Sequence, residues 1–240
     1  MKGIRIMTKT KTKIKDDVKK KFGDGIMLGA NSIIDQNLIN IPVSPSLDII
    51  LNGGIPEGSF VIFTGQPKCG KTTTSLDFAA TAQRPEYAHG SFSEGREVYY
   101  LNIEGRLKKR DLEGIPGINL DKFNIIGSQE GKILHGEEYL QIAEKIINEI
   151  PGSIVIIDSY SALCTEAEIT STMDKMQRAD GAKLLAKFCR KVANVIPVNK
   201  NIVIGITHLM GNPGYGNVEW KEKSGQAIAY QTDIKLRAKY

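Results

Sequence analysis

The chain has 240 residues, 41% of them hydrophobic and 25% charged, which is typical of a globular protein with one sizeable core. It contains no run of the ~20 apolar residues that a membrane-spanning helix requires, and its start lacks the apolar stretch of a secretion signal. These features argue against membrane and secreted proteins, so we expect a cytoplasmic protein with no membrane partner.

The net charge of +5 is concentrated at the start of the chain. Residues 1–21 hold nine lysines and arginines against two aspartates, so the rest of the chain is slightly acidic. Such a run is typical of a solvated tail, and it would also attract phosphate groups in a salt-dependent way. The sequence leaves both interpretations open.

Six short runs rich in β-branched residues predict buried strands. They are 59–64, 98–103, 123–126, 154–158, 202–207 and 233–236. Apolar residues recur at helical spacing between them, over about 70–83, 137–149 and 182–195. Strands that alternate with helices predict an α/β domain, with a mostly parallel twisted sheet and helices on both of its faces.

Three segments rich in glycine, proline or polar residues predict loops, at 83–95, 165–180 and 210–225. The first has the features of a surface excursion. The other two follow strands directly, at the edge of the sheet where ligands of open α/β folds bind.

Residues 65–72 match the phosphate-loop motif G-x-x-x-x-G-K-[ST] in full, between a predicted strand and a predicted helix. Its glycines let backbone N–H groups turn toward phosphates, Lys71 would contact the β- and γ-phosphates, and Thr72 would ligate Mg²⁺. The positive end of the following helix favours the same anion. The residues expected to bind the nucleotide are Gly65, Gln66, Pro67, Lys68, Cys69, Gly70, Lys71, Thr72 and Thr73.

Three polar residues at the ends of other predicted strands extend this site. Asp158 ends an apolar strand, which is the Walker B pattern of a carboxylate that holds Mg²⁺. Glu104 ends a second strand, where it would act on the attacking water, unless it is an exposed loop glutamate. His208 follows a third strand and suits a sensor of the γ-phosphate, although a lone histidine there is often structural.

The other two cysteines, Cys164 and Cys189, lie far from Cys69 and from each other, without the spacing of metal ligands. Neither a zinc site nor a disulfide framework follows from this pattern. We expect reduced and mostly buried thiols, with Cys69 as the exception because it lies inside the phosphate loop.

These motifs, in this order, resemble the RecA family of recombinases. The matching segments are 21–27, 46–51, 53–58, 65–72, Glu104, 158–163 and 233–237. The resemblance implies a RecA-like P-loop NTPase core over 31–240. It also implies a basic N-terminal segment over 1–30, in which a helix within 8–21 would dock on a neighbouring protomer.

The resemblance implies a DNA-dependent ATPase that uses ATP and Mg²⁺. It would act as a homologous recombinase whose protomers form a helical filament on single-stranded DNA, which then engages duplex DNA. Two other functions stay open, namely a different RecA-fold motor (a hexameric helicase or a RadA/KaiC-like ATPase) and a recombination mediator that does not hydrolyse ATP.

The resemblance also implies two DNA-binding loops, at 165–177 and 209–223. Aromatic side chains would stack on bases and lysines would neutralise phosphate. Trp220 could instead pack against the domain. The basic residues beside the first loop could instead form a solvated charged surface. The expected DNA-binding residues are Arg178, Lys183 and Arg190 beside the first loop, and Met210, Tyr215, Trp220, Lys221 and Lys223 in the second.

The chain departs from the RecA pattern in three places. His208 stands where bacterial RecA has glutamine, which resembles the phage UvsX type. The basic run 106–110 replaces the residues that lie near adenine in the family, so adenine contacts cannot be carried over. The sequence ends after the sixth predicted strand, without the family's further strands and C-terminal domain, so we expect either a truncated chain or a minimal variant.

Overall fold

The computed structural model of the protein describes residues 13–90, 92–170, 180–211, 220–222 and 226–239. The chain divides into two compact units, Met1–Leu38 and Ile39–Tyr240, and each is described by itself. No helix in these described ranges combines the length and the apolar character needed to cross a membrane.

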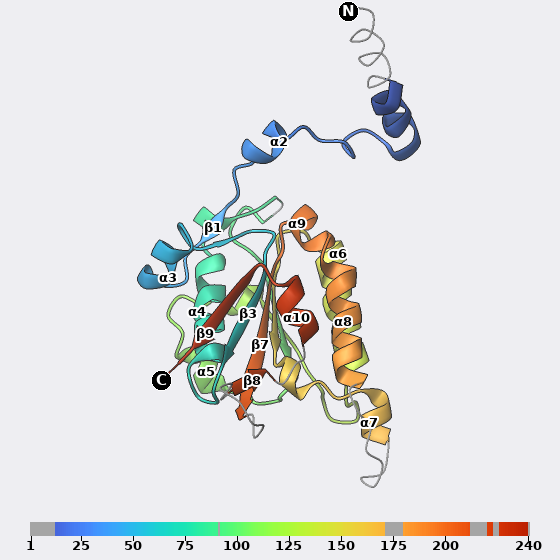
Figure 1. The fold of residues 1–240 in the computed structure, drawn as a ribbon. Coiled ribbons are helices and arrows are strands. Elements are labelled where there is room, and N and C mark those ends of the chain that lie inside the picture. The colour runs from blue at the N-terminus through green and yellow to red at the C-terminus, as the bar shows by residue number, and fades with distance from the viewer. Residues whose placement is uncertain (1–12, 91, 171–179, 212–219, 223–225, 240) are drawn as a thin grey trace, which may run out of the picture. The chain divides into compact units, whose positions relative to one another are not determined.

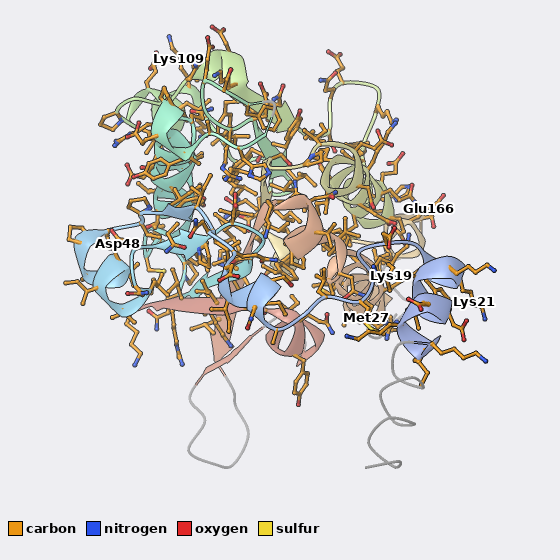
Figure 2. The ribbon with its side chains drawn as sticks, turned by 90° about the horizontal axis from the view of Figure 1, so that it is seen from above. Lys19, Lys21, Met27, Asp48, Lys109 and Glu166 are labelled. Atoms are coloured by element: carbon orange, nitrogen blue, oxygen red, sulfur yellow. The ribbon has the colours of Figure 1, made fainter. Side chains whose placement is uncertain are left out.

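The described part of the first unit, residues 13–38, contains two short helices. Residues 13–22 are helical, so the described part of the helix expected over 8–21 is present. A second helix, α2, covers Asn31–Ile34. In the described part of this unit no residue is buried, and its large apolar side chains face solvent. They are Ile14, Phe22, Ile26, Met27, Leu28, Ile33, Ile34 and Leu38, and Figure 2 labels Met27 together with Lys19 and Lys21.

The second unit is built on a mostly parallel sheet with the strand order β5-β4-β6-β7-β3-β9, and β8 pairs antiparallel with β7. A separate two-stranded sheet joins β1 and β2. All six predicted strands are present. The strands are β1 (Asn40–Ile41), β2 (Ile55–Pro56), β3 (Phe60–Gly65), β4 (Val98–Asn102), β5 (Phe123–Ile126), β6 (Ile154–Asp158), β7 (Ile202–Gly211), β8 (Trp220–Glu222) and β9 (Ile234–Ala238).

Helices cover both faces of this sheet, with α4 and α5 on one side and α6 and α8 on the other (Figure 1). The three predicted helices correspond to α4, α6 and α8, with ends shifted by up to three residues. The helices are α3 (Pro45–Ile50), α4 (Lys71–Ala82), α5 (Lys109–Glu113), α6 (Gly136–Glu149), α7 (Glu166–Thr170), α8 (Asp180–Val192), α9 (Val195–Asn199) and α10 (Gln226–Gln231), with 3₁₀ turns η1 (Pro85–Tyr87), η2 (Leu120–Lys122) and η3 (Tyr160–Ala162).

The strand β6 shows how the sheet divides the core into two layers. Successive side chains of a strand point to opposite faces. Ile154 and Ile156 therefore join the apolar cluster beneath α4, whereas Val155 and Ile157 join the cluster beneath α6 and α8. All four are fully buried, which explains why the strand reads as one continuous apolar run rather than an alternating one.

Three expectations from the sequence are wrong in detail. Much of the described part of the loops expected at 165–180 and 210–225 is regular structure, because α7 lies in the former and, in the latter, β7 runs on to Gly211 and pairs with β8. The cysteines are free, but only Cys189 is buried, and burial raises its pKa to about 12. Cys164, two residues after η3, is exposed, and Cys69 is half-buried. The extension of β7 could not be predicted from periodicity, because it depends on pairing between residues 209–211 and residues 220–222.

Candidate active site

Four neighbouring strands, β3, β4, β6 and β7, bring the predicted site residues to one edge of the sheet. The register pairs Gly65 at the end of β3 with His208 in β7, and Asn102 at the end of β4 with Asp158 at the end of β6. Because β6 also pairs with β7, these four strands are neighbours along the edge. Residues from distant parts of the chain therefore meet here, as expected for the carboxyl ends of parallel strands.

The phosphate loop curls into a tight turn between β3 and α4. Gly70 has φ of 85°, a left-handed conformation that glycine adopts without strain, and Lys68 has φ of 64°. The Lys71 ammonium donates hydrogen bonds to the carbonyl oxygens of Gly65 (3.1 Å) and Gln66 (2.7 Å), and only 5% of the residue is exposed. Its charge is thus held inside the loop, beside the N-terminus of α4, where both would attract an anion.

Asp158 is 7% exposed, and its carboxylate accepts two hydrogen bonds on one oxygen. Its Oδ2 receives the Thr72 hydroxyl at 2.7 Å and the Tyr100 hydroxyl at 2.6 Å. Burial raises the pKa of Asp158, and these two hydrogen bonds oppose that rise. Burial also raises the pKa of Tyr100 well above its usual range, so this hydroxyl stays a donor.

Thr72 and Asp158 fit a magnesium ion by their chemistry. Both offer hard oxygen atoms, which Mg²⁺ prefers, and the two oxygens lie within hydrogen-bond distance of each other at the wall of the pocket. Over the described part of the chain, no cluster of three or more His, Cys, Asp or Glu residues offers a second type of metal site. Phosphate oxygens and water would supply the remaining ligands of a magnesium ion here.

Glu104 is the centre of a second hydrogen-bonded group. Its Oε1 accepts from Ser159 Oγ at 2.6 Å and lies 2.8 Å from His208 Nε2, while Arg106 approaches Oε2 at 3.5 Å. The hydrogen bond with His208, followed by that from Ser159, lowers the pKa of Glu104 to about 2. The carboxylate is therefore ionised at neutral pH, and His208 Nε2 carries the proton between them.

His208 also joins the two segments that were expected to bind DNA. Its backbone N–H donates to Ser161 Oγ at 2.8 Å, so β7 is tied to η3, which leads into α7. Close packing supports the same contact, because a side chain at Gly205 in β7 would collide with the ring of Tyr160. β7 and η3, which precede the two expected loops, are therefore in direct contact.

The site residues line an open pocket of about 520 Å³ on the edge of the sheet. This volume lies in the range of small-molecule binding sites, about 300–1,000 Å³. Four cationic side chains line it: Lys68, Lys71, Arg106 and Arg110. Leu107 and Ile115 add an apolar wall at the α5 side, whereas Lys109 of α5 points outward (Figure 2).

Most, but not all, of the expected nucleotide-binding residues face this pocket. Its walls include Pro67, Lys68, Gly70, Lys71, Thr72 and Thr73. Gly65 and Gln66 instead supply the carbonyl groups that hold Lys71, and Cys69 Sγ lies 3.7 Å from its ammonium. Three other predicted site residues line the same pocket, namely Glu104, Asp158 and His208. The residues expected to act on water, on Mg²⁺ and on the γ-phosphate are therefore close together.

Sequence reasoning missed two residues, Tyr100 and Ser159. Tyr100 looks like an ordinary aromatic residue of a buried strand, and only the spatial alignment of β4 with β6 shows its hydroxyl beside Asp158. Ser159 follows the Walker B aspartate directly, so its position in the motif was a signal that could have been used.

The expected DNA-binding residues are only partly described. Lys183 and Arg190 lie exposed on α8. Met210 lies in β7, and Trp220 and Lys221 lie in β8, but nothing is described of their side chains. Arg178, Tyr215 and Lys223 fall outside the described residues. The DNA-binding role of all eight residues stays a prediction.

Comparison with known proteins shows the family of the chain. The model of the RecA N-terminal domain family matches residues 9–239. The chain belongs to the RecA family. The match spans the phosphate loop, the Walker B strand and β9, so the predictions of the family and of a RecA-like α/β core are confirmed.

Several curated proteins named RecA are similar to the chain over most of its length. RecA of Lactobacillus delbrueckii is 30% identical over 226 residues, which are 92% of this chain and 63% of that protein. RecA of Clostridium botulinum is 31% identical over 224 residues (91% and 58%), and RecA of Nitratidesulfovibrio vulgaris is 30% identical over 227 (91% and 58%). The chain thus spans about three fifths of the length of these relatives.

Proposed function

We propose that the chain binds and hydrolyses ATP with Mg²⁺, and that it acts as a homologous recombinase whose protomers assemble on single-stranded DNA. One observation carries the proposal. Lys71, Thr72, Asp158, Glu104 and His208 line one pocket at the carboxyl edge of a parallel sheet, in a chain that belongs to the RecA family. Each residue type has a distinct use in phosphoryl transfer.

The phosphates would lie in the loop between β3 and α4. Lys71 and the N-terminus of α4 supply positive charge there, and Lys68 and Arg106 add further charge at the pocket wall. Thr72 and Asp158 would hold Mg²⁺, which when bound neutralises phosphate charge and orients the leaving group. Arg110, Leu107 and Ile115 are available to the rest of the nucleotide.

Glu104 would act on the water that attacks the γ-phosphate. In the described arrangement its Oε1 is taken by Ser159 and His208, and its lowered pKa makes it a weak base. If His208 turned its Nε2–H toward a γ-phosphate, Glu104 would lose a hydrogen bond and become more basic. The same movement would pull on β7, which provides a physical route from nucleotide state to the expected second DNA-binding loop.

We infer assembly and DNA binding from membership of the RecA family. The exposed apolar side chains of residues 13–38 support docking of this segment on another protomer, because such side chains gain from burial. The exposed cations Lys183 and Arg190 support contact with phosphate, as do the lysines of 209–223.

ATP hydrolysis measured with and without single-stranded DNA tests the proposal, and electron microscopy of the same samples shows the assembly. We expect DNA to stimulate hydrolysis and helical filaments to form with ATP. Closed rings would instead favour a hexameric RecA-fold motor. Nucleotide binding without turnover, with or without DNA, would favour a recombination mediator and refute the ATPase.

A further inference from the structure

We propose that Tyr100 is a positioning residue for Asp158, and that its hydroxyl strengthens binding of the divalent cation that accompanies the nucleotide. The proposal rests on the function proposed above, since it assumes that Asp158 faces such a cation. It goes beyond the family's motifs, because Tyr100 belongs to none of the matching segments.

The contact is short and buried. The Tyr100 hydroxyl donates to Asp158 Oδ2 at 2.6 Å, and Tyr100 is 1% exposed. The same oxygen accepts from Thr72, so the carboxylate is held from β4 and from α4 at once. Two donors converging on one oxygen determine the rotation of the carboxylate, and thereby the direction in which its other oxygen points.

The tyrosine is itself held by rigid neighbours. It lies in the middle of β4, paired on one side with Ile125 of β5 and on the other with Ile156 of β6. Its ring also packs against Phe123, with ring centroids 5.9 Å apart. A donor placed on a central strand is positioned more accurately than one on a loop.

This arrangement matches the way that proteins support metal ligands. A ligating carboxylate is usually hydrogen-bonded by a second residue, and removal of that residue typically weakens metal affinity about 10–100-fold. A phenylalanine at position 100 would fill the same core space, so the hydroxyl alone can be tested. Tyr99, the preceding residue of β4, points to the opposite face of the sheet and provides a matched control.

The experiment uses the full chain and a fluorescent, non-hydrolysable ATP analogue. Its Kd is measured in EDTA and in saturating Mg²⁺ for the wild type, Tyr100→Phe and Tyr99→Phe, and the ratio of the two values is the affinity gained from the cation. We expect Tyr100→Phe to reduce this gain by about tenfold, with the Kd in EDTA unchanged. Tyr99→Phe should behave as the wild type.

Each other outcome has a definite meaning. Equal gains in the wild type and Tyr100→Phe would overturn the role of Tyr100 and leave the proposed function intact. No gain in the wild type would refute the cation assignment of Asp158 and with it the proposal. An equal loss of affinity with and without Mg²⁺ would show a general effect on the pocket and would also overturn it.

A second comparison tests whether Tyr100 acts through Asp158. Asp158→Asn removes the charge that Tyr100 is proposed to position, so adding Tyr100→Phe to it should reduce the Mg²⁺ gain no further. Additive losses in the double variant would contradict the proposal. Thermal unfolding of all variants shows whether the fold is retained.

Discussion

At the scale of single residues, the hydrogen bonds to Glu104 leave its carboxylate a weak base, so it would not activate a water in this arrangement. Ser159 and His208 both approach its Oε1, and the pKa of Glu104 falls to about 2. Breaking a hydrogen bond to this carboxylate costs free energy unless the donor finds another acceptor. In the proposed cycle this group is a γ-phosphate that binds His208, which would make hydrolysis dependent on a bound triphosphate.

Glu104→Gln tests this role. The amide keeps the size of the side chain but cannot take a proton, so we expect the kcat of ATP hydrolysis to fall by about 10²–10⁴-fold, while ATP affinity stays close to that of the wild type. Steady-state hydrolysis and equilibrium binding measure the two effects. Glu130→Gln, on an exposed turn, serves as the control. Unchanged turnover in Glu104→Gln would assign the attacking water to another residue.

At the scale of elements, the motifs in the sequence predicted the site better than they predicted the loops. The phosphate loop and the Walker B strand depend on local spacing, so the sequence alone was enough to predict that Lys71 and Asp158 belong to one pocket, which both of them line. The hydrogen bond from Tyr100 could not, because it depends on the register between β4 and β6, which are more than fifty residues apart. The extension of β7 into an expected loop depends on pairing with β8, which is equally non-local.

The amino ends of the same strands are joined by a buried ion pair. Arg96, which is fully buried, donates to Glu57 at 2.6 Å and to the carbonyl oxygens of Tyr87, Gly152 and Lys200. Burial lowers the pKa of Arg96, and Glu57 opposes that shift. The guanidinium thus links the segments that enter β4, β6 and β7, at the edge of the sheet opposite the site.

Glu57→Gln should therefore destabilise the second unit strongly. It leaves the Arg96 charge buried without a countercharge, for which we expect a loss of about 3–5 kcal/mol in the free energy of unfolding. Chemical denaturation followed by circular dichroism measures this value. Glu86→Gln, which changes an exposed glutamate in η1, should shift it by less than about 0.5 kcal/mol. A similarly small effect at Glu57 would mean that the carbonyl groups alone stabilise Arg96.

At the scale of the whole molecule, the two units differ in what they can bury. The second has two apolar layers around its sheet, whereas the described part of the first has eight exposed large apolar side chains and no buried residue. This contrast is expected for a segment that completes its burial on another chain. The basic residues of 1–21 would attract phosphate independently of that contact.

The double substitution Phe22→Ser and Ile26→Ser in the full chain tests the assembly role. We expect a smaller assembly in sedimentation velocity with ATP, because the docking surface loses apolar area, and an unchanged thermal unfolding midpoint. Val198→Ser, which alters an exposed apolar residue of the second unit, should leave assembly unchanged. Assembly that survives the double substitution would exclude residues 22–26 from the contact between protomers.

Isothermal titration with a non-hydrolysable ATP analogue and Mg²⁺ tests the central claim most directly, namely that the pocket around Lys71 is the nucleotide site. The account predicts one site per chain, with affinity reduced at least about tenfold by Lys71→Ala, because the substitution removes a buried charge from the phosphate position. The control Lys145→Ala, on the exposed face of α6, should bind as the wild type does. Absence of binding, or binding that Lys71→Ala leaves unchanged, would contradict the account.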